Sequence, residues 1–278
     1  MATYGAHVIM ACRDPKRADA AIQDLTLKVP NGSFEFLRLD LSDWDSIVAF
    51  HKELKEKHEK VHILVNNAAV VMDKYEKGKQ GRELMMSVNY LGTVLLTQLM
   101  MDVLGNAASD VNPRVVFVAS NAHTLADKLD VKSLDEPEEE PKKGWSISES
   151  MAKYGRTKQC LLLYLLHLNK QLRADNSKIL VYGADPGWVS TELGRAADDK
   201  FYSGIIKTLE FFTAKPPEDG CISSVYAATS PDLESVNYSG QYLEGVRKAA
   251  NWHKDCKDEA LAAQLSEWTT NVLKPYFQ

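Results

Sequence analysis

Strand-length runs of apolar residues alternate with segments of helical period along the chain. The apolar runs cover residues 7–12, 34–40 and 61–66, and segments with helical spacing cover 15–28 and 43–58. This alternation is typical of βαβ units, in which helices connect parallel strands. The stretches 63–65 and 115–118 are continuously apolar, as parallel strands buried on both faces should be. The sequence therefore predicts an α/β fold, a doubly wound parallel sheet with helices on both faces.

Length and composition restrict what such a sheet can do. The chain has 278 residues, 45% hydrophobic and 26% charged, and without a dividing linker we expect one domain over residues 1–278. A formal net charge of −5 without clustered Lys or Arg offers no footprint for nucleic acid. The four cysteines lack disulfide or metal-ligand spacing, which indicates a reducing, cytoplasmic location and no metal site. No apolar run reaches the length of a membrane span.

The pentapeptide Tyr154-Gly-Arg-Thr-Lys158 places a phenol and an ammonium one helical turn apart on one face. A free tyrosine has a pKa near 10, and a neighbouring cation that stabilises the phenolate would lower that pKa. Such a pair can donate a proton to a carbonyl oxygen or accept one from an alcohol. By itself, a Tyr and a Lys four residues apart are equally typical of an exposed pair on a helix whose opposite face packs into the core.

Four further motifs accompany this pair in a fixed order. They are Asn66-Asn67-Ala68-Ala69 after an apolar run, Val88-Asn89-Tyr90-Leu91-Gly92, Ser120 after the run 114–119, and Asp185-Pro186-Gly187-Trp188-Val189-Ser190-Thr191. The ordered set resembles the short-chain dehydrogenase/reductase family over nearly the whole chain. Segments such as Ala11-Cys12-Arg13-Asp14 and Ser120-Asn121-Ala122-His123 are most similar to its retinol-dehydrogenase-like and WW-domain-oxidoreductase-like branch. The resemblance implies a Rossmann-like fold and hydride transfer between a nicotinamide cofactor and an alcohol or carbonyl.

The resemblance also implies roles for four candidate catalytic residues. Tyr154 would be the general acid in reduction and the general base in oxidation, and Ser120 would hold the substrate oxygen. Lys158 would lower the pKa of Tyr154 and bind the nicotinamide ribose. Asn89 would hold a water that links the lysine to solvent.

The choice of cofactor depends on the residues that follow the run 7–12. An acidic residue near this point accepts the 2′-hydroxyl of NAD, whereas an Arg accommodates the 2′-phosphate of NADP. Cys12 occupies the expected acidic position and Arg13 follows it, which favours NADP, although Asp14 keeps NAD open. By resemblance, the other cofactor-binding residues are Asp40, Leu41, Asn67, Ala68, Tyr154, Lys158, Pro186, Val189 and Thr191. Ala69 replaces the family's usual glycine.

The region after Thr191 indicates the class of substrate. Aromatic and aliphatic residues there form a candidate lid, namely Trp188, Phe201, Tyr202, Ile205, Ile206, Leu209, Phe211 and Phe212. A lid of this composition favours a small apolar carbonyl or alcohol of the retinoid, steroid or lipid-like kind. The helix after Tyr154 is apolar almost all round, so we expect this helix to be buried. A partner subunit in a homo-oligomer is one way to bury it. The acidic stretch 134–143 is expected to be a solvated loop.

The family's first strand and its Gly-rich phosphate-binding turn have no counterpart in this sequence, which begins near the end of the following helix. We therefore expect an N-terminally truncated member whose sheet lacks its first strand, the partner of both the second and fourth strands. Two functions stay open. The chain is either an NADP-dependent oxidoreductase, attached to a membrane if an anchor precedes it, or a non-catalytic relative that acts through protein partners or folds poorly.

Overall fold

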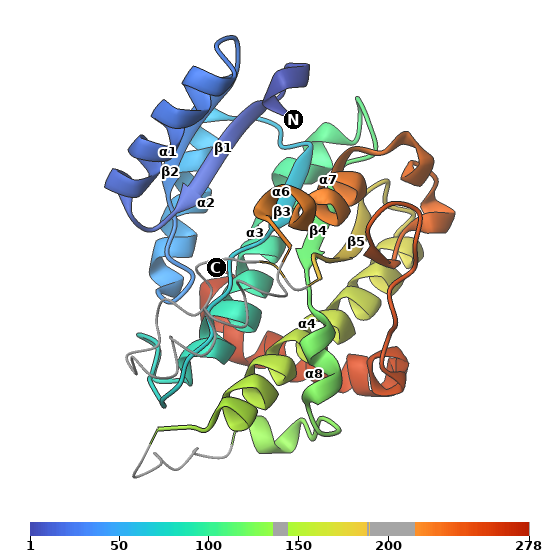
Figure 1. The fold of residues 1–278 in the computed structure, drawn as a ribbon. Helices are drawn as coiled ribbons and strands as arrows, with labels where there is room; N and C mark the ends of the chain where they lie inside the picture. The colour runs from blue at the N-terminus through green and yellow to red at the C-terminus, as the bar shows by residue number, and fades with distance from the viewer. Residues whose placement is uncertain (136–143, 188, 190–214, 278) are drawn as a thin grey trace.

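The computed structural model describes residues 1–135, 144–187, 189 and 215–277 (Figure 1). Its parallel strands form a two-stranded and a four-stranded sheet. The first pairs β1 (His7–Cys12) with β2 (Ser33–Arg38), and the second has the order β3 (Ile63–Asn66), β4 (Arg114–Val118), β5 (Leu180–Asp185), β6 (Tyr242–Glu244). The α/β Rossmann-like architecture predicted from the sequence is confirmed.

Helices connect these strands in the expected alternation. They are α1 (Pro15–Lys28), α2 (Trp44–Lys57), the π-helix η2 (Met86–Gly92), α3 (Thr93–Ala107), α4 (Ile147–Ala174), α6 (Pro217–Gly220), α7 (Ile222–Thr229) and α8 (Glu259–Leu273). Short 3₁₀ helices are η1 (Ala2–Tyr4), η3 (Asn121–Leu125), η4 (Lys132–Leu134), η6 (Pro231–Leu233), η7 (Val236–Tyr238), η8 (Lys254–Lys257) and η9 (Lys274–Tyr276). None of the helices in the described part of the chain is both long and apolar enough to span a membrane.

Helices cover both faces of the four-stranded sheet (Figure 1). Alternate residues of β4 point to opposite faces, as the pleat of a strand requires. Val115 and Phe117 belong to the large core with α2, α3, α4 and α8, whereas Val116 joins Ala227 and Ala228 of α7 in a second core. All five residues of β4 are buried. The sheet's central strands are thus enclosed on both sides.

Two helix starts show how the sequence sets local structure. Asp14 caps α1 by accepting hydrogen bonds from the backbone N–H groups of Lys16 and Arg17, and Pro15 occupies the first helical position. Ser146 and Glu149 form a capping box at the start of α4. These caps fix where α1 follows β1 and where the helix that carries Tyr154 begins.

The parallel ladder is interrupted between β1 and β3. Within the described residues, β1 pairs with β2 alone and β3 pairs with β4 alone. The residues of β1 are all partly or fully exposed, and Val65 of β3 is 37% exposed. The two open edges agree with the expectation that both strands lack a ladder partner. The missing first strand itself stays a prediction.

Helix α4 is buried by its own chain rather than needing a partner subunit. Leu161, Leu162, Leu163 and Leu165 are at most 1% exposed. They contact the sheet and α8, which follows far later in the sequence. The apolar character of this helix therefore gives no support for a homo-oligomer, which remains a prediction.

Thr191, the candidate lid and residues 136–143 of the acidic loop lie outside the described residues.

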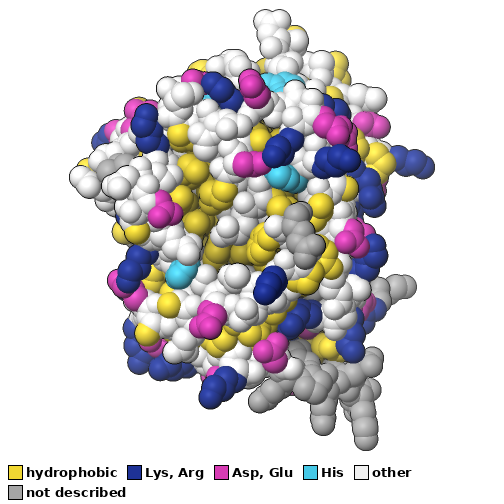
Figure 2. All heavy atoms as spheres, turned by 180° about the vertical axis from the view of Figure 1, so that it is seen from behind, with side chains coloured by type: hydrophobic (Ala, Val, Ile, Leu, Met, Phe, Trp, Pro, Cys, Tyr) yellow, Lys and Arg dark blue, Asp and Glu magenta, His cyan; other side chains and the backbone are white. Residues whose placement is uncertain are grey.

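The surface combines both signs of charge. On the face drawn in Figure 2, Lys and Arg side chains lie among Asp and Glu around the rim, and hydrophobic side chains gather near the middle. Many of the charged groups form ion pairs, such as Lys55 with Asp102 and Lys60 with Asp110. On this face there is no continuous basic stripe of the kind that follows a phosphate backbone.

Candidate active site

The predicted motifs meet at the carboxyl ends of β3, β4 and β5, the edge where ligands bind in open parallel sheets. Asn66 ends β3, Ser120 follows β4 by two residues, and Asp185 ends β5. Tyr154 and Lys158 reach this edge from the first half of α4, which contacts η3 just after Ser120. The structure therefore brings the candidate catalytic residues together from separate parts of the chain.

Ser120 and Tyr154 are partners at the centre of this edge. The Ser120 hydroxyl accepts a hydrogen bond from the backbone N–H of Ala122 at 3.1 Å. Tyr154 is 5% exposed, and burial raises the pKa of its phenol above the ordinary value although a hydrogen bond with Ser120 lowers it. A phenol in this state keeps its proton at neutral pH. It therefore carries the proton that a general acid must donate.

A glycine makes this approach of α4 to the serine loop possible. A Cβ atom on Gly155 would lie 2.2 Å from the backbone oxygen of Ala122, far inside any normal contact. The glycine lets the two backbones pass closely, which places Tyr154 beside Ser120. In the sequence motif, Gly155 is only a spacer between Tyr154 and Lys158.

Lys158 is almost completely buried, at 2% exposure. Its ammonium nitrogen Nζ donates a hydrogen bond to the backbone oxygen of Val118 at 2.7 Å and lies 5.6 Å from the centroid of the Tyr154 ring. Burial lowers the pKa of Lys158 to about 8, against an opposing effect of the Asp185 carboxylate. The lysine thus stays mostly protonated at neutral pH. Lys158 is not among the groups that shift the Tyr154 pKa in this state: burial and the Asp185 charge raise that pKa, and the hydrogen bond with Ser120 lowers it.

Asn89 lies at the middle of the π-helix η2 and is fully buried. Its side-chain oxygen accepts from the N–H of Val70 at 2.8 Å, and its amide donates to the Val70 carbonyl at 2.9 Å and to the Thr157 hydroxyl at 3.2 Å. These bonds join η2 to the segment after β3 and to α4. The side chain therefore supports the site, and a water-binding role would fall to another atom of this residue.

His123 was part of the sequence resemblance but was not predicted to act in the site. The ring is fully buried, with Nδ1 2.7 Å from the Ser120 carbonyl and Nε2 3.1 Å from the backbone nitrogen of His253. The carbonyl accepts and the backbone N–H donates, so Nδ1 carries the proton and the neutral ring satisfies both partners. His123 thereby joins the Ser120 loop to a segment 130 residues later.

We expect this neutral histidine to make stability fall at mildly acidic pH. Burial lowers the pKa of His123 below its ordinary value, more than the Ser120 carbonyl and the Asp185 charge raise it. As the pH falls below about 6.5, the unfolded chain binds a proton first, so the free energy of unfolding decreases until the folded-state pKa is reached. Denaturant unfolding at several pH values should show a shallower decrease for His123→Gln. The exposed His62→Gln is the control, and an identical slope for both variants would contradict the assignment.

Asp185 and Tyr242 also belong to this edge, although neither was among the predicted site residues. The buried Asp185 carboxylate accepts from the Tyr242 hydroxyl at 2.9 Å and from the N–H of Gly187 at 2.8 Å, and its negative charge acts on Lys158. The pairing crosses 57 residues of sequence. A signal that could have identified Asp185 is its position as an acidic residue at the end of an apolar strand.

The predicted adenosine-side residues lie at the ends of β1, β2 and β3. Arg13 follows β1 and is exposed, whereas the Asp14 carboxylate caps α1. The Asp40 carboxylate accepts from the N–H and hydroxyl of Ser42, at 3.0 and 2.6 Å. The carbonyl of Leu41 lies so close to Gly92 that a Cβ there would be 2.4 Å away. These contacts fix the turn after β2 against η2.

The remaining predicted cofactor residues divide between described and undescribed parts of the chain. Asn67 and Ala68 are exposed after β3, and Pro186 and Val189 are half-buried after β5. A cavity of about 260 Å³ opens beside Pro186, between the end of β5, the start of α7 and the end of β6. Thr191 lies outside the described residues.

The donors at this edge fit a nicotinamide cofactor. Lys158 has three N–H donors, and among the described residues its hydrogen bond goes to the Val118 carbonyl. A buried ammonium with donors to spare suits the ribose hydroxyls of a dinucleotide. The exposed guanidinium of Arg13 and the exposed amide of Asn67 provide further polar groups at neighbouring strand ends.

Comparison with known proteins identifies the family. A family model described as short chain dehydrogenase matches residues 1–128. A short-chain dehydrogenase/reductase, drtF, from Aspergillus calidoustus is 33% identical, with 99% of this chain and 88% of the relative covered. Retinol dehydrogenase 13 of Mus musculus is 32% identical, with 98% and 77% covered. A crystal structure of a protein from Mycobacterium paratuberculosis has the same fold, with a TM-score of 0.72 at 23% identity over 98% of this chain and 86% of that one. The chain therefore belongs to the short-chain dehydrogenase/reductase family, in its retinol-dehydrogenase-like branch, and is an oxidoreductase of the kind that transfers hydride with a nicotinamide cofactor.

Proposed function

We propose that this protein interconverts an alcohol and a carbonyl on an apolar substrate with NADP(H), using Asn89, Ser120, Tyr154 and Lys158. The proposal rests mainly on the meeting of Ser120, Tyr154 and the buried Lys158 at one strand edge. The retinol dehydrogenase among its relatives favours a retinoid, steroid or other lipid-like substrate.

Each side chain has a task that follows from its surroundings. In reduction, the Ser120 hydroxyl and the Tyr154 phenol hold the carbonyl oxygen of the substrate, and the Tyr154 proton moves to that oxygen. The bound nicotinamide supplies the hydride. Lys158, kept protonated beside the tyrosine ring, stabilises the phenolate that remains. Asn89 and Gly155 hold η2 and α4 in the positions that this transfer needs.

An activity comparison tests the proposal directly. Purified protein is supplied with all-trans-retinal or with a short polar aldehyde, in the presence of NADPH or NADH, and nicotinamide oxidation is followed by absorbance. We expect the highest kcat/KM for retinal with NADPH. Absence of turnover with every pair, in protein shown to be folded by circular dichroism, would favour the non-catalytic alternative.

Cofactor preference should depend on Arg13. Arg13 directly follows β1 and is exposed, whereas the neighbouring Asp14 carboxylate is occupied in capping α1. A charge-assisted contact with a 2′-phosphate contributes about 1.5–3 kcal/mol, so Arg13→Ala should weaken NADPH binding about 10- to 100-fold and NADH binding little.

Binding of both cofactors is measured by fluorescence titration. Lys28→Ala, which removes an exposed cation at the far end of α1, is the control and should leave both affinities unchanged. Equal losses for NADPH and NADH in Arg13→Ala would count against a 2′-phosphate contact.

A further inference from the structure

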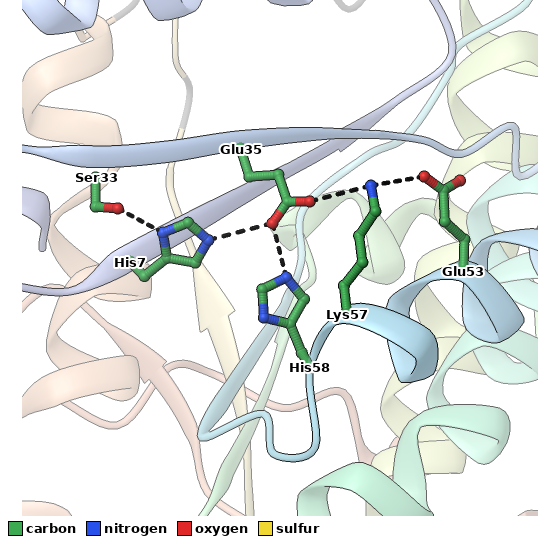
Figure 3. Close-up of polar contacts among 6 residues, drawn as sticks. All are labelled: His7, Ser33, Glu35, Glu53, Lys57 and His58. Atoms are coloured by element: carbon green, nitrogen blue, oxygen red, sulfur yellow. Dashed lines mark hydrogen bonds and ion pairs between the residues drawn. The ribbon is translucent and has the colours of Figure 1, made fainter.

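Two histidines and a glutamate converge beside the start of β1 in the two-stranded sheet (Figure 3). The candidate active site lies elsewhere, at the carboxyl ends of strands in the other sheet. His7 is the first residue of β1, Glu35 is the third residue of β2, and His58 directly follows α2. The Glu35 oxygen Oε2 lies 3.3 Å from Nε2 of His7 and 2.7 Å from Nε2 of His58. Three elements thus direct one potential ligand each to a common point.

The chemistry of this cluster suits a divalent metal. Imidazole nitrogen and carboxylate oxygen are ordinary zinc ligands, at about 2.0–2.2 Å from the ion. Two such ligands in a tetrahedral site are about 3.3 Å apart, and the three ligand atoms here all lie within 4.8 Å of one another. The distance from His7 to Glu35 already matches, and the contact from His58 to Glu35 needs to lengthen by about 0.6 Å. Small side-chain adjustments would form the site.

Surrounding contacts hold the ligands in suitable orientations. Nδ1 of His7 lies 2.6 Å from the Ser33 hydroxyl, which leaves Nε2 directed at Glu35. A second contact of this kind sets the tautomer and ring position of a metal-binding histidine. Lys57 lies 3.2 Å from the other Glu35 oxygen, Oε1, and is also paired with Glu53 at 2.8 Å. Oε2 therefore remains with the two imidazoles.

Solvent can reach this cluster, because the side chains of His7, Glu35 and His58 are 41%, 24% and 24% exposed. A water molecule could thus complete a four-coordinate site. Among the described residues, His7, Glu35 and His58 are the one such group of three possible ligands; His51, for example, is paired with Asp102 but belongs to no group of three.

We propose that His7, Glu35 and His58 bind a zinc ion, with water as the fourth ligand. The ion would tie the start of β1 to β2 and to the end of α2. It would thereby stabilise the two-stranded sheet, whose β1 edge has no partner among the described strands. The site lies apart from the proposed catalytic edge, so its test does not depend on the proposed function. The spacing of the cysteines could not reveal this metal site, because its ligands are histidine and glutamate. These ligands are also 23 or more residues apart, so they form no short sequence motif.

Calorimetric titration of the full chain, without a histidine tag, with zinc chloride alone tests this proposal. We expect one ion per chain and an unfolding midpoint that rises with zinc. Binding should weaken at least tenfold in His7→Ala, Glu35→Gln and His58→Ala, and about tenfold in Ser33→Ala. Lys57→Met removes a nearby positive charge and should strengthen binding severalfold. His51→Ala and Cys221→Ser are controls for other surface ligands and should bind as the unchanged chain does.

Cobalt gives a second readout that needs no variant. Co²⁺ in a four-coordinate site of nitrogen and oxygen ligands has intense visible absorption, and zinc should abolish that absorption at one equivalent. No zinc binding by the unchanged chain, or equal binding by folded His7→Ala and His58→Ala, would overturn the proposal. Binding that is lost in Cys221→Ser would overturn it also.

Discussion

Tyr154→Phe should reduce turnover about 10²- to 10⁴-fold, the usual contribution of a positioned general acid or base. The change removes the transferable proton and the hydrogen bond with Ser120 but keeps the buried ring. Cofactor affinity should change little, because Lys158 and the strand ends remain. Single-turnover kinetics with NADPH and retinal, beside fluorescence titration of NADPH, separate the chemical step from binding.

Tyr164→Phe is a matched control on the same helix. Tyr164 is also buried in α4, and its hydroxyl lies 2.6 Å from the side-chain nitrogen of Gln98, away from Ser120. Loss of the Tyr164 hydroxyl should lower the free energy of unfolding by about 1 kcal/mol and change turnover by no more than a few fold. Near-normal turnover in Tyr154→Phe, or equal losses in the two variants, would exclude Tyr154 as the proton donor.

Gly155→Ala should be the most damaging small substitution in α4. The new Cβ would lie 2.2 Å from the Ala122 carbonyl, and backbone stands on both sides of the contact, so the helix or the serine loop must move. We expect a loss of about 1–3 kcal/mol in the free energy of unfolding, as for other overpacked sites. A displacement of about 1 Å between Tyr154 and Ser120 would lower turnover about 10²-fold.

Gly105→Ala separates this contact from the general effect of a helical glycine. Gly105 is an exposed residue of α3, and nothing lies within 4 Å of a Cβ placed there. This change should raise stability by about 0.5–1 kcal/mol, because alanine loses less backbone entropy on folding. Denaturant unfolding and steady-state kinetics measure both variants. If Gly155→Ala is as stable and as active as the unchanged chain, the close approach of α4 does not set the site.

The order and type of the elements could be read from the sequence with useful accuracy. The predicted run 7–12 is β1 and the predicted segment 15–28 is α1, because alternating apolar runs and an Asp-Pro start are local signals. Strand ends are harder to place from the sequence: near Asp185 the apolar run 178–182 stops three residues before β5 does. Parallel pairing with β4 and β6 extends that strand, and such pairing is not a local property.

Contacts between distant segments could not be predicted in the same way. The bond between His123 and His253 and that between Tyr242 and Asp185 cross long stretches of sequence. The segment around Asn89 reads in the sequence as an ordinary apolar helix, whereas in the structure it is a π-helix whose Asn89 side chain bonds to the Val70 backbone. The metal-type cluster of His7, Glu35 and His58 has no spacing motif at all. Each of these features depends on how separate elements are packed.

The sequence by itself therefore determined the class of fold, the family resemblance and the identity of the candidate catalytic residues. These depend on local periodicity and on short motifs, each carried within a few neighbouring residues. Only the tertiary structure decided that α4 is buried by its own chain. It also decided that burial raises the pKa of Tyr154 and lowers that of Lys158. Burial and electrostatic environment come from atoms that are distant in sequence, so they exist only once the chain has folded.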